Sequence, residues 1–126
     1  MRYMIAGDAG NLVAQMRRGV LPYCVLAMVR DKERYGFELV QSLASIDGMV
    51  TGEGTIYPIL NRLRAEGLVQ SQWVEAEAGH PRKYYQLTQS GRERATRMAE
   101  TWTEFSASLG CLIEPVLNER KMEQPL

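Results

Sequence analysis

The spacing of apolar and polar residues predicts helices along most of the chain. A helical pattern begins at Asn11, and after Gly19 the residues become apolar on most helical faces (VLPYCVLAMVRD), as in a helix buried at the centre of a small bundle. Residues 31–36 form a polar turn, and residues 37–46 (FELVQSLASI) again place apolar side chains at helical spacing. Residues 1–10 have no period and contain two glycines, so we expect a leader that is frayed or ordered only by packing.

A third helix is predicted over residues 53–66, and Gly67 is the glycine expected just after its C-terminus. Its apolar residues recur at the i, i+3, i+4 and i+7 positions of one helix face: Ile56, Ile59, Leu60 and Leu63. A proline costs no hydrogen bond in the first turn, so Pro58 favours Thr55 as the N-cap residue. A start at Thr51 would instead place Pro58 inside the helix with a local kink.

Two segments after the third helix have the composition and alternation of strands. They cover residues 68–76 (LVQSQWVEA) and 83–88 (KYYQLT), and a turn with glycine and proline separates them. This arrangement predicts a β-hairpin. One of Tyr84 and Tyr85 must be buried, because neighbouring residues on a strand face opposite sides.

The last predicted helix begins at Thr88 or Ser90, where Ser90 and Glu93 fit a capping box. Its apolar residues alternate in steps of three and four, the repeat of a coiled-coil seam: Ala95, Met98, Trp102, Phe105, Leu109, Leu112 and Val116. A helix of about 25 residues is about 38 Å long, too long for so small a core to cover. Self-association is the simplest way to bury the seam, and we assign Leu12 and Met16 to the same dimer interface. Pro115 is expected to kink or end the helix.

The order of these elements predicts a mainly α protein with a two-stranded β-hairpin, an α+β fold. We expect a winged helix-turn-helix followed by a long C-terminal dimerisation helix. The predicted parts are a leader (1–10), the winged helix-turn-helix (11–88), the dimerisation helix (89–118) and a frayed tail (119–126).

Charge placement refines this picture more than composition does. The 126 residues carry 15 basic and 15 acidic side chains, which argues against a wholly basic nucleic-acid coat. By position, residues 54–97 hold seven Lys or Arg against four Glu, whereas residues 98–126 hold two basic residues against five Glu. The sequence has no apolar run of the roughly 20 residues that a membrane span needs and no signal-peptide pattern, so we expect a cytoplasmic protein.

The outward face of the third helix is the main candidate site. Opposite the core positions lie Pro58, Asn61 and Ala65, and an Asn on such a face can pair with adenine in the major groove. A polar helix face taken alone is more often simply solvated, but the basic hairpin that follows favours double-stranded DNA as the partner. The candidate DNA-binding residues are Tyr35, Thr55, Tyr57, Asn61, Arg62, Arg64, His80, Arg82, Lys83 and Tyr84.

Several motifs together resemble the PadR family of bacterial transcriptional regulators over about residues 12–110. They are RGVL (18–21), YGFEL (35–39), EGTIYP (53–58), RLRAEGLV (62–69) and PRKYYQLT (81–88). The resemblance is to the small subclass with a single C-terminal dimerisation helix, and it implies a dimeric repressor that releases its operator when an effector binds. It also implies that the helix with Thr55, Tyr57, Asn61 and Arg62 is the recognition helix, and that residues 81–84 belong to the wing.

Trp102 is the residue at which a small-molecule site can be predicted. Similar small regulators have an aromatic residue at the matching point of the C-terminal helix, and some hold flat hydrophobic compounds between two such helices. An aromatic or hydrophobic effector is therefore one expectation, and a plain interface core is the other. The candidate effector pocket comprises Met16, Met98, Trp102 and Phe105.

The sequence excludes most other functions. His80, the single histidine, lies in a turn without a nucleophile, and Gly52 and Gly54 lack the lysine and strand of a phosphate-binding loop, so we predict no enzyme. Cys24 and Cys111 are far apart and are expected to be reduced core or interface thiols, so no metal and no cofactor is expected. The alternative to DNA binding is a winged-helix protein-interaction module that dimerises.

Overall fold

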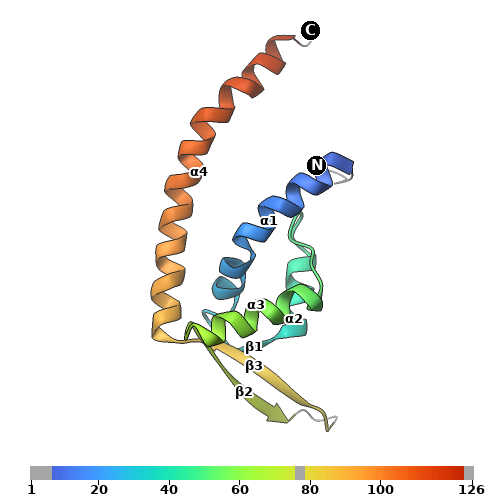
Figure 1. Ribbon diagram of the computed structural model, residues 1–126, viewed down its shortest axis with the longest axis vertical. Helices are drawn as coiled ribbons and strands as arrows, with labels where there is room; N and C mark the ends of the chain where they lie inside the picture. The colour runs from blue at the N-terminus through green and yellow to red at the C-terminus, as the bar shows by residue number, and fades with distance from the viewer. Residues whose placement is uncertain (1–6, 76–78, 124–126) are drawn as a thin grey trace. The chain divides into compact units, whose positions relative to one another are not determined.

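The computed structural model describes residues 7–75 and 79–123, and the chain divides into two compact units between Ala95 and Thr96. The elements are α1 (Gly7–Met28), β1 (Arg34–Tyr35), α2 (Gly36–Ala44), α3 (Glu53–Ala65), β2 (Val69–Glu75), β3 (Pro81–Leu87) and α4 (Gln89–Glu123) (Figure 1). The first unit contains every element up to the first turns of α4, and the rest of α4 forms the second unit. This is the mainly helical winged fold that the sequence predicts.

The core of the first unit is formed by one apolar stripe from each of the first three helices and by the sheet. The fully buried side chains include Leu26 of α1, Leu39 of α2 and Leu60 of α3, none of which is exposed to solvent. Each such side chain contributes about 1.5–3 kcal/mol when it leaves water. Pro22 lies inside α1 without ending it, because buried residues on both sides of the proline anchor the helix to the core.

The sheet has three antiparallel strands in the order β1–β3–β2, whereas the sequence predicted a two-stranded hairpin. The two residues of β1, which we expected in a polar turn, pair with β3 in the register Arg34↔Tyr85 and Tyr35↔Tyr84. A two-residue strand has no alternation to detect, and it forms here because the edge of β3 offers a partner. Tyr85 is buried and Tyr84 is half-buried, which confirms the predicted alternation.

Helix α3 begins earlier than Pro58 suggested. Gly52 is the N-cap residue, so the predicted cap at Thr55 is wrong and Pro58 lies inside the helix. The N–H groups of Thr55 and Ile56 both donate to the Gly52 carbonyl, at 3.1 Å, which closes the first turn. At the other end Gly67 has φ +76° and the Leu68 N–H donates to the Leu63 carbonyl at 2.9 Å, the expected glycine-terminated helix end.

The start of α4 is fixed to the turn that follows α3. Thr88, and not the capping box predicted at Ser90 and Glu93, caps this helix: the Thr88 hydroxyl accepts from the Gly91 N–H at 3.0 Å and donates to the Gly67 carbonyl at 2.6 Å. Gly91 is buried so closely that a Cβ there would overlap the Leu68 carbonyl oxygen.

Both ends of the chain are more helical than the sequence indicated. Helix α1 already begins at Gly7, so part of the predicted leader is helical, while residues 1–6 lie outside the described residues. Helix α4 continues through Pro115 to Glu123, so the helix does not end at Pro115, and residues 119–123, expected in a frayed tail, are helical; residues 124–126 lie outside the described residues. One proline removes one hydrogen bond, and the helix on both sides of it continues to propagate.

Candidate nucleic-acid interface

The predicted orientation of α3 is confirmed. Ile56, Leu60 and Leu63 are buried in the core, and on the opposite face Asn61 is exposed together with Pro58 and Ala65. Thr55 is exposed in the first turn of the same helix. The outward face of α3 therefore presents one exposed amide between small exposed residues.

Tyr57 lies at the side of this face and is fixed by Gly36 at the start of α2. A Cβ added to Gly36 would lie 2.5 Å from Cε1 of the Tyr57 ring, so the ring occupies the space that any larger residue would fill. Burial raises the pKa of Tyr57, and the nearby Glu53 and Tyr35 raise it further. The phenol therefore stays protonated at neutral pH and is available as a hydrogen-bond donor at the edge of the exposed face, where it is 39% exposed.

A second aromatic contact connects the hairpin to the helix-turn-helix. The rings of Tyr35 in β1 and Tyr84 in β3 meet edge to face with centroids 5.3 Å apart, and the Arg82 guanidinium lies 4.6 Å from the Tyr35 ring centroid. The Tyr35 N–H donates to Oε1 of Glu38 at 3.1 Å in the first turn of α2. Three predicted residues from two motifs, Tyr35, Arg82 and Tyr84, are therefore brought together through a strand that the sequence did not reveal.

Lys83 faces the other side of the hairpin, where it lies between two aromatic rings. Its Nζ is 5.8 Å from the Trp73 ring centroid and 5.9 Å from that of Tyr85. Trp73 is paired with Lys83 in the β2–β3 register and is 67% exposed, so we add it to the candidate site. Sequence reasoning placed Trp73 on a strand but gave it no role, although the alternation Val69, Ser71, Trp73 put it on the same face as buried Val69.

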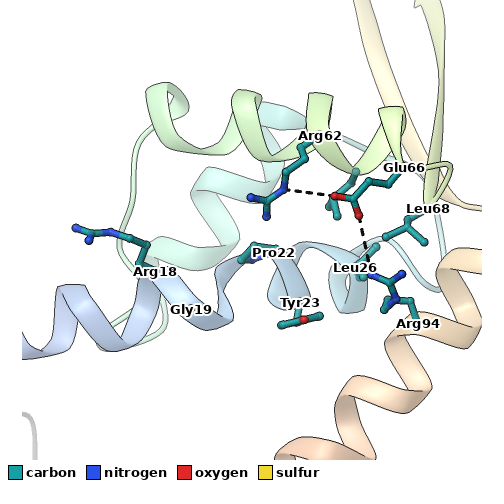
Figure 2. A pocket seen from close by; sticks show the side chains of 10 residues that line it. Arg18, Gly19, Pro22, Tyr23, Leu26, Arg62, Glu66, Leu68 and Arg94 are labelled. Carbon is teal, nitrogen blue, oxygen red and sulfur yellow. Dashed lines mark ion pairs between the residues drawn. The ribbon is translucent and has the colours of Figure 1, made fainter.

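The two arginines of α3 point to different sides of the helix. Nε of Arg62 lies 3.8 Å from Oε1 of Glu66, and Oε2 of Glu66 lies 3.9 Å from Nη1 of Arg94, so Arg62 is directed toward the start of α4 (Figure 2). Arg64 lies on the side of the hairpin, close to Tyr85 of β3. Burial and then the nearby Tyr57 raise the pKa of the Tyr85 phenol, and the positive charge of Arg64 lowers it. Arg64 is exposed, and so is His80 near the hairpin turn.

Most of the predicted interface and effector residues are exposed apolar side chains. In the first unit Leu12 and Met16 are exposed on α1 and Ala95 is half-buried. In the second unit Met98 is half-buried, and the exposed seam residues of α4 are Trp102, Phe105, Leu109, Leu112 and Val116. Ile113 and Leu117, which the seam prediction omitted, are also exposed, so the apolar face of α4 is wider than a strict heptad seam.

Within the described part of the chain no helix is both long and apolar enough to cross a membrane. In that same part no three His, Cys, Asp or Glu side chains lie close enough together to hold a metal ion. Cys24 is half-buried with a pKa raised by burial, and Cys111 is exposed.

Comparisons with known proteins identify the fold and the family. Residues 25–97 match the transcriptional regulator PadR-like family. A PadR family transcriptional regulator from Eggerthella lenta shares 34% identity and superimposes with a TM-score of 0.75, covering 83% of this chain and 91% of that chain. A PadR-like regulator from Bacillus cereus shares 33% identity with a TM-score of 0.71, covering 79% and 96%.

A curated relative gives the same assignment. Transcriptional regulator Rv3488 of Mycobacterium tuberculosis is 34% identical over 82 residues, which cover 65% of this chain and 75% of that protein. These relatives are regulators of transcription and not enzymes. The chain therefore belongs to the PadR family of DNA-binding transcriptional regulators.

Proposed function

We propose that the protein is a dimeric repressor that binds an inverted-repeat operator. Helix α3 lies in the major groove, where the Asn61 amide reads an adenine edge, and the β2–β3 hairpin contacts the backbone or enters the minor groove. The observation that carries this proposal is the division of α3 into a fully buried face and an open face centred on Asn61. The contacts of Tyr57 with Gly36 and of Tyr35 with Tyr84 support a fixed orientation of helix and hairpin.

The exposed face of the second unit supports the proposal of a dimer. Its helix exposes a stripe of apolar side chains that a monomer leaves in water, and a second copy of the same stripe is the simplest cover. We propose the winged helix-turn-helix of residues 11–88 as the reading part and residues 89–118 as the dimerisation helix. Because a twofold dimer presents two identical α3 helices, the operator is expected to be an inverted repeat.

We further propose that a small aromatic or hydrophobic effector releases the operator. Trp102 is 51% exposed and Phe105 is 59% exposed, three residues apart on one helix, and both are suited to stack on a flat ligand. Met98, on the same helix, supplies an adaptable side chain beside them. The effector acts in the cytoplasm, where the operator DNA is located.

The test is selection of bound fragments from genomic DNA by the full-length protein, followed by footprinting of the enriched sequence. We expect enrichment of one inverted repeat, protected on two adjacent major-groove segments about 10–10.5 base pairs or a multiple of this spacing apart. A protein that enriches no sequence, yet dimerises and captures a specific protein partner, would instead be a winged-helix interaction module.

A further inference from the structure

Trp73 is a large aromatic side chain that the core of the protein does not bury. It lies on the same face of β2 as the buried Val69, but at its position the hairpin has already passed the helices of the first unit (Figure 1). Because 67% of the side chain is exposed, burial of the ring contributes little to the stability of the fold. The contact that the ring does make is with Lys83, the residue directly across the strand pair.

Lys83 is held by rings and not by a carboxylate. Its Nζ lies 5.8 Å from the Trp73 ring centroid and 5.9 Å from that of Tyr85, both within the roughly 6 Å over which a ring attracts a cation. Among the residues that the structure describes, no Asp or Glu forms an ion pair with this lysine. The half-buried side chain is therefore directed by two aromatic rings, and its charge stays available to a further partner.

The face of the hairpin that carries Lys83 adjoins α3. Tyr85, whose buried ring forms one side of the lysine contact, also lies close to Arg64 of α3. Arg64 is exposed and follows Asn61 by three residues on the same helix. Lys83 and Arg64 therefore place two cations on the side of the first unit where the hairpin meets α3. A duplex whose major groove holds α3 has its phosphate backbone at the edge of that groove, within the region that such cations serve.

We propose that Trp73 is a positioning residue for DNA binding, whose indole, with the ring of Tyr85, holds Lys83 in place for a backbone phosphate. The inference rests on the proposed contact of the hairpin with DNA. A free lysine side chain loses rotamer freedom when it binds a phosphate. A lysine that is ordered before the DNA arrives avoids this loss on binding, so the Trp73 ring raises affinity through Lys83. The effect does not depend on base sequence, because phosphates carry none.

Anisotropy titration of the full-length protein with a labelled duplex of mixed sequence, at several salt concentrations, tests this role. Lys83→Met should make the slope of log affinity against log salt concentration less steep by about one, because one phosphate contact is lost. Trp73→Leu should weaken binding about two- to fivefold, the factor that corresponds to an exposed cation–π contact, and should leave the slope unchanged because the charge remains. Trp73→Phe keeps a ring and should bind within about twofold of the wild type.

The double variant Trp73→Leu with Lys83→Met separates positioning from direct contact. It should bind no more weakly than Lys83→Met alone, because no cation is left for the ring to position. If Trp73→Leu costs as much in the Lys83→Met background as in the wild type, then Trp73 acts on DNA independently of Lys83 and the proposal is wrong. Gln70→Leu is the matched control: it changes an exposed residue on the opposite face of β2 and should bind as the wild type does.

Undiminished binding by Trp73→Leu, or a loss in Trp73→Phe or Gln70→Leu as large as in Trp73→Leu, would overturn the role of Trp73. Because the duplex contains no operator, these outcomes leave operator recognition by α3 standing. Conversely, if fragment selection enriches no inverted repeat while the mixed-sequence duplex shows the expected differences, the positioning role stands and the repressor function fails. A wild-type protein that binds no duplex at all would overturn both.

Discussion

The rings of Tyr35 and Tyr84 meet edge to face, with centroids 5.3 Å apart, across the pairing of β1 with β3. This contact joins the residue that precedes α2 to the strand that carries Arg82 and Lys83. The hairpin is thereby held to the helix-turn-helix by side chains as well as by backbone pairing, and the orientation of the wing depends on both rings.

We expect Tyr35→Leu and Tyr84→Leu to be coupled. Their interaction energy in a double-mutant cycle should be about 0.5–1.5 kcal/mol, the range for aromatic pairs beyond their burial. Urea unfolding of the two single variants and the double variant measures it. Additive losses would show that the two rings stabilise the fold independently of each other.

Gly36→Ala should destabilise the protein and weaken operator binding, because the new methyl group displaces the Tyr57 ring. Thermal unfolding and operator titration measure the two effects. The matched test is the double variant with Tyr57→Ala, in which the clash is absent and the stability of Gly36→Ala should be partly regained. If the second substitution only adds a further loss, the close approach of these two residues is not the cause.

Gly91→Ala and Gly110→Ala form a matched pair on α4. At Gly91 the added methyl group overlaps the Leu68 carbonyl oxygen, so we expect a loss of about 1–3 kcal/mol, as for overpacked sites. At Gly110 no atom of the described residues lies within 4 Å of the added methyl group, and alanine should gain up to about 1 kcal/mol from helix propensity. Chemical denaturation distinguishes the two signs, and a stabilised Gly91→Ala would contradict the close packing of α4 on the turn after α3.

Leu109→Glu should convert the dimer to monomers, because the new carboxylate would be buried in the seam without a partner. Ser108→Glu, on an adjacent exposed position of the same helix, should leave the dimer intact. Sedimentation velocity separates the two states. A Leu109→Glu protein that sediments as an unchanged dimer would show that α4 does not pair through this stripe.

The elements with long periodic patterns were predictable from sequence. The core face of α3 followed from helical spacing at Ile56, Leu60 and Leu63, and the burial of Tyr85 followed from strand alternation. The cap of α3 was not predictable from Pro58, because the buried face of the helix outweighs the one hydrogen bond that the proline removes.

Contacts between residues distant in sequence were beyond the reach of local patterns. Strand β1 exists only through its pairing with β3, so Tyr35 could be named but its ring contact could not. Arg62 was predicted as a DNA contact from its helix face. Its ion pair with Glu66 joins residues four positions apart on α3, whereas the second ion pair of Glu66, with Arg94 at the start of α4, could not be predicted from a local pattern. The exposure of Trp73 similarly depends on where the hairpin leaves the core.

The most direct test of DNA reading by α3 compares Asn61→Ala with Lys83→Ala in an anisotropy titration. Each variant is titrated against the operator and against a scrambled duplex at several salt concentrations. We expect Asn61→Ala to reduce the difference in binding free energy between the operator and the scrambled duplex by about 1–3 kcal/mol. The salt dependence of binding should stay unchanged. Lys83→Ala should weaken binding to both duplexes alike. It should also make the slope of log affinity against log salt concentration less steep by about one. An unchanged affinity ratio in Asn61→Ala, or operator affinity independent of salt, would contradict the account.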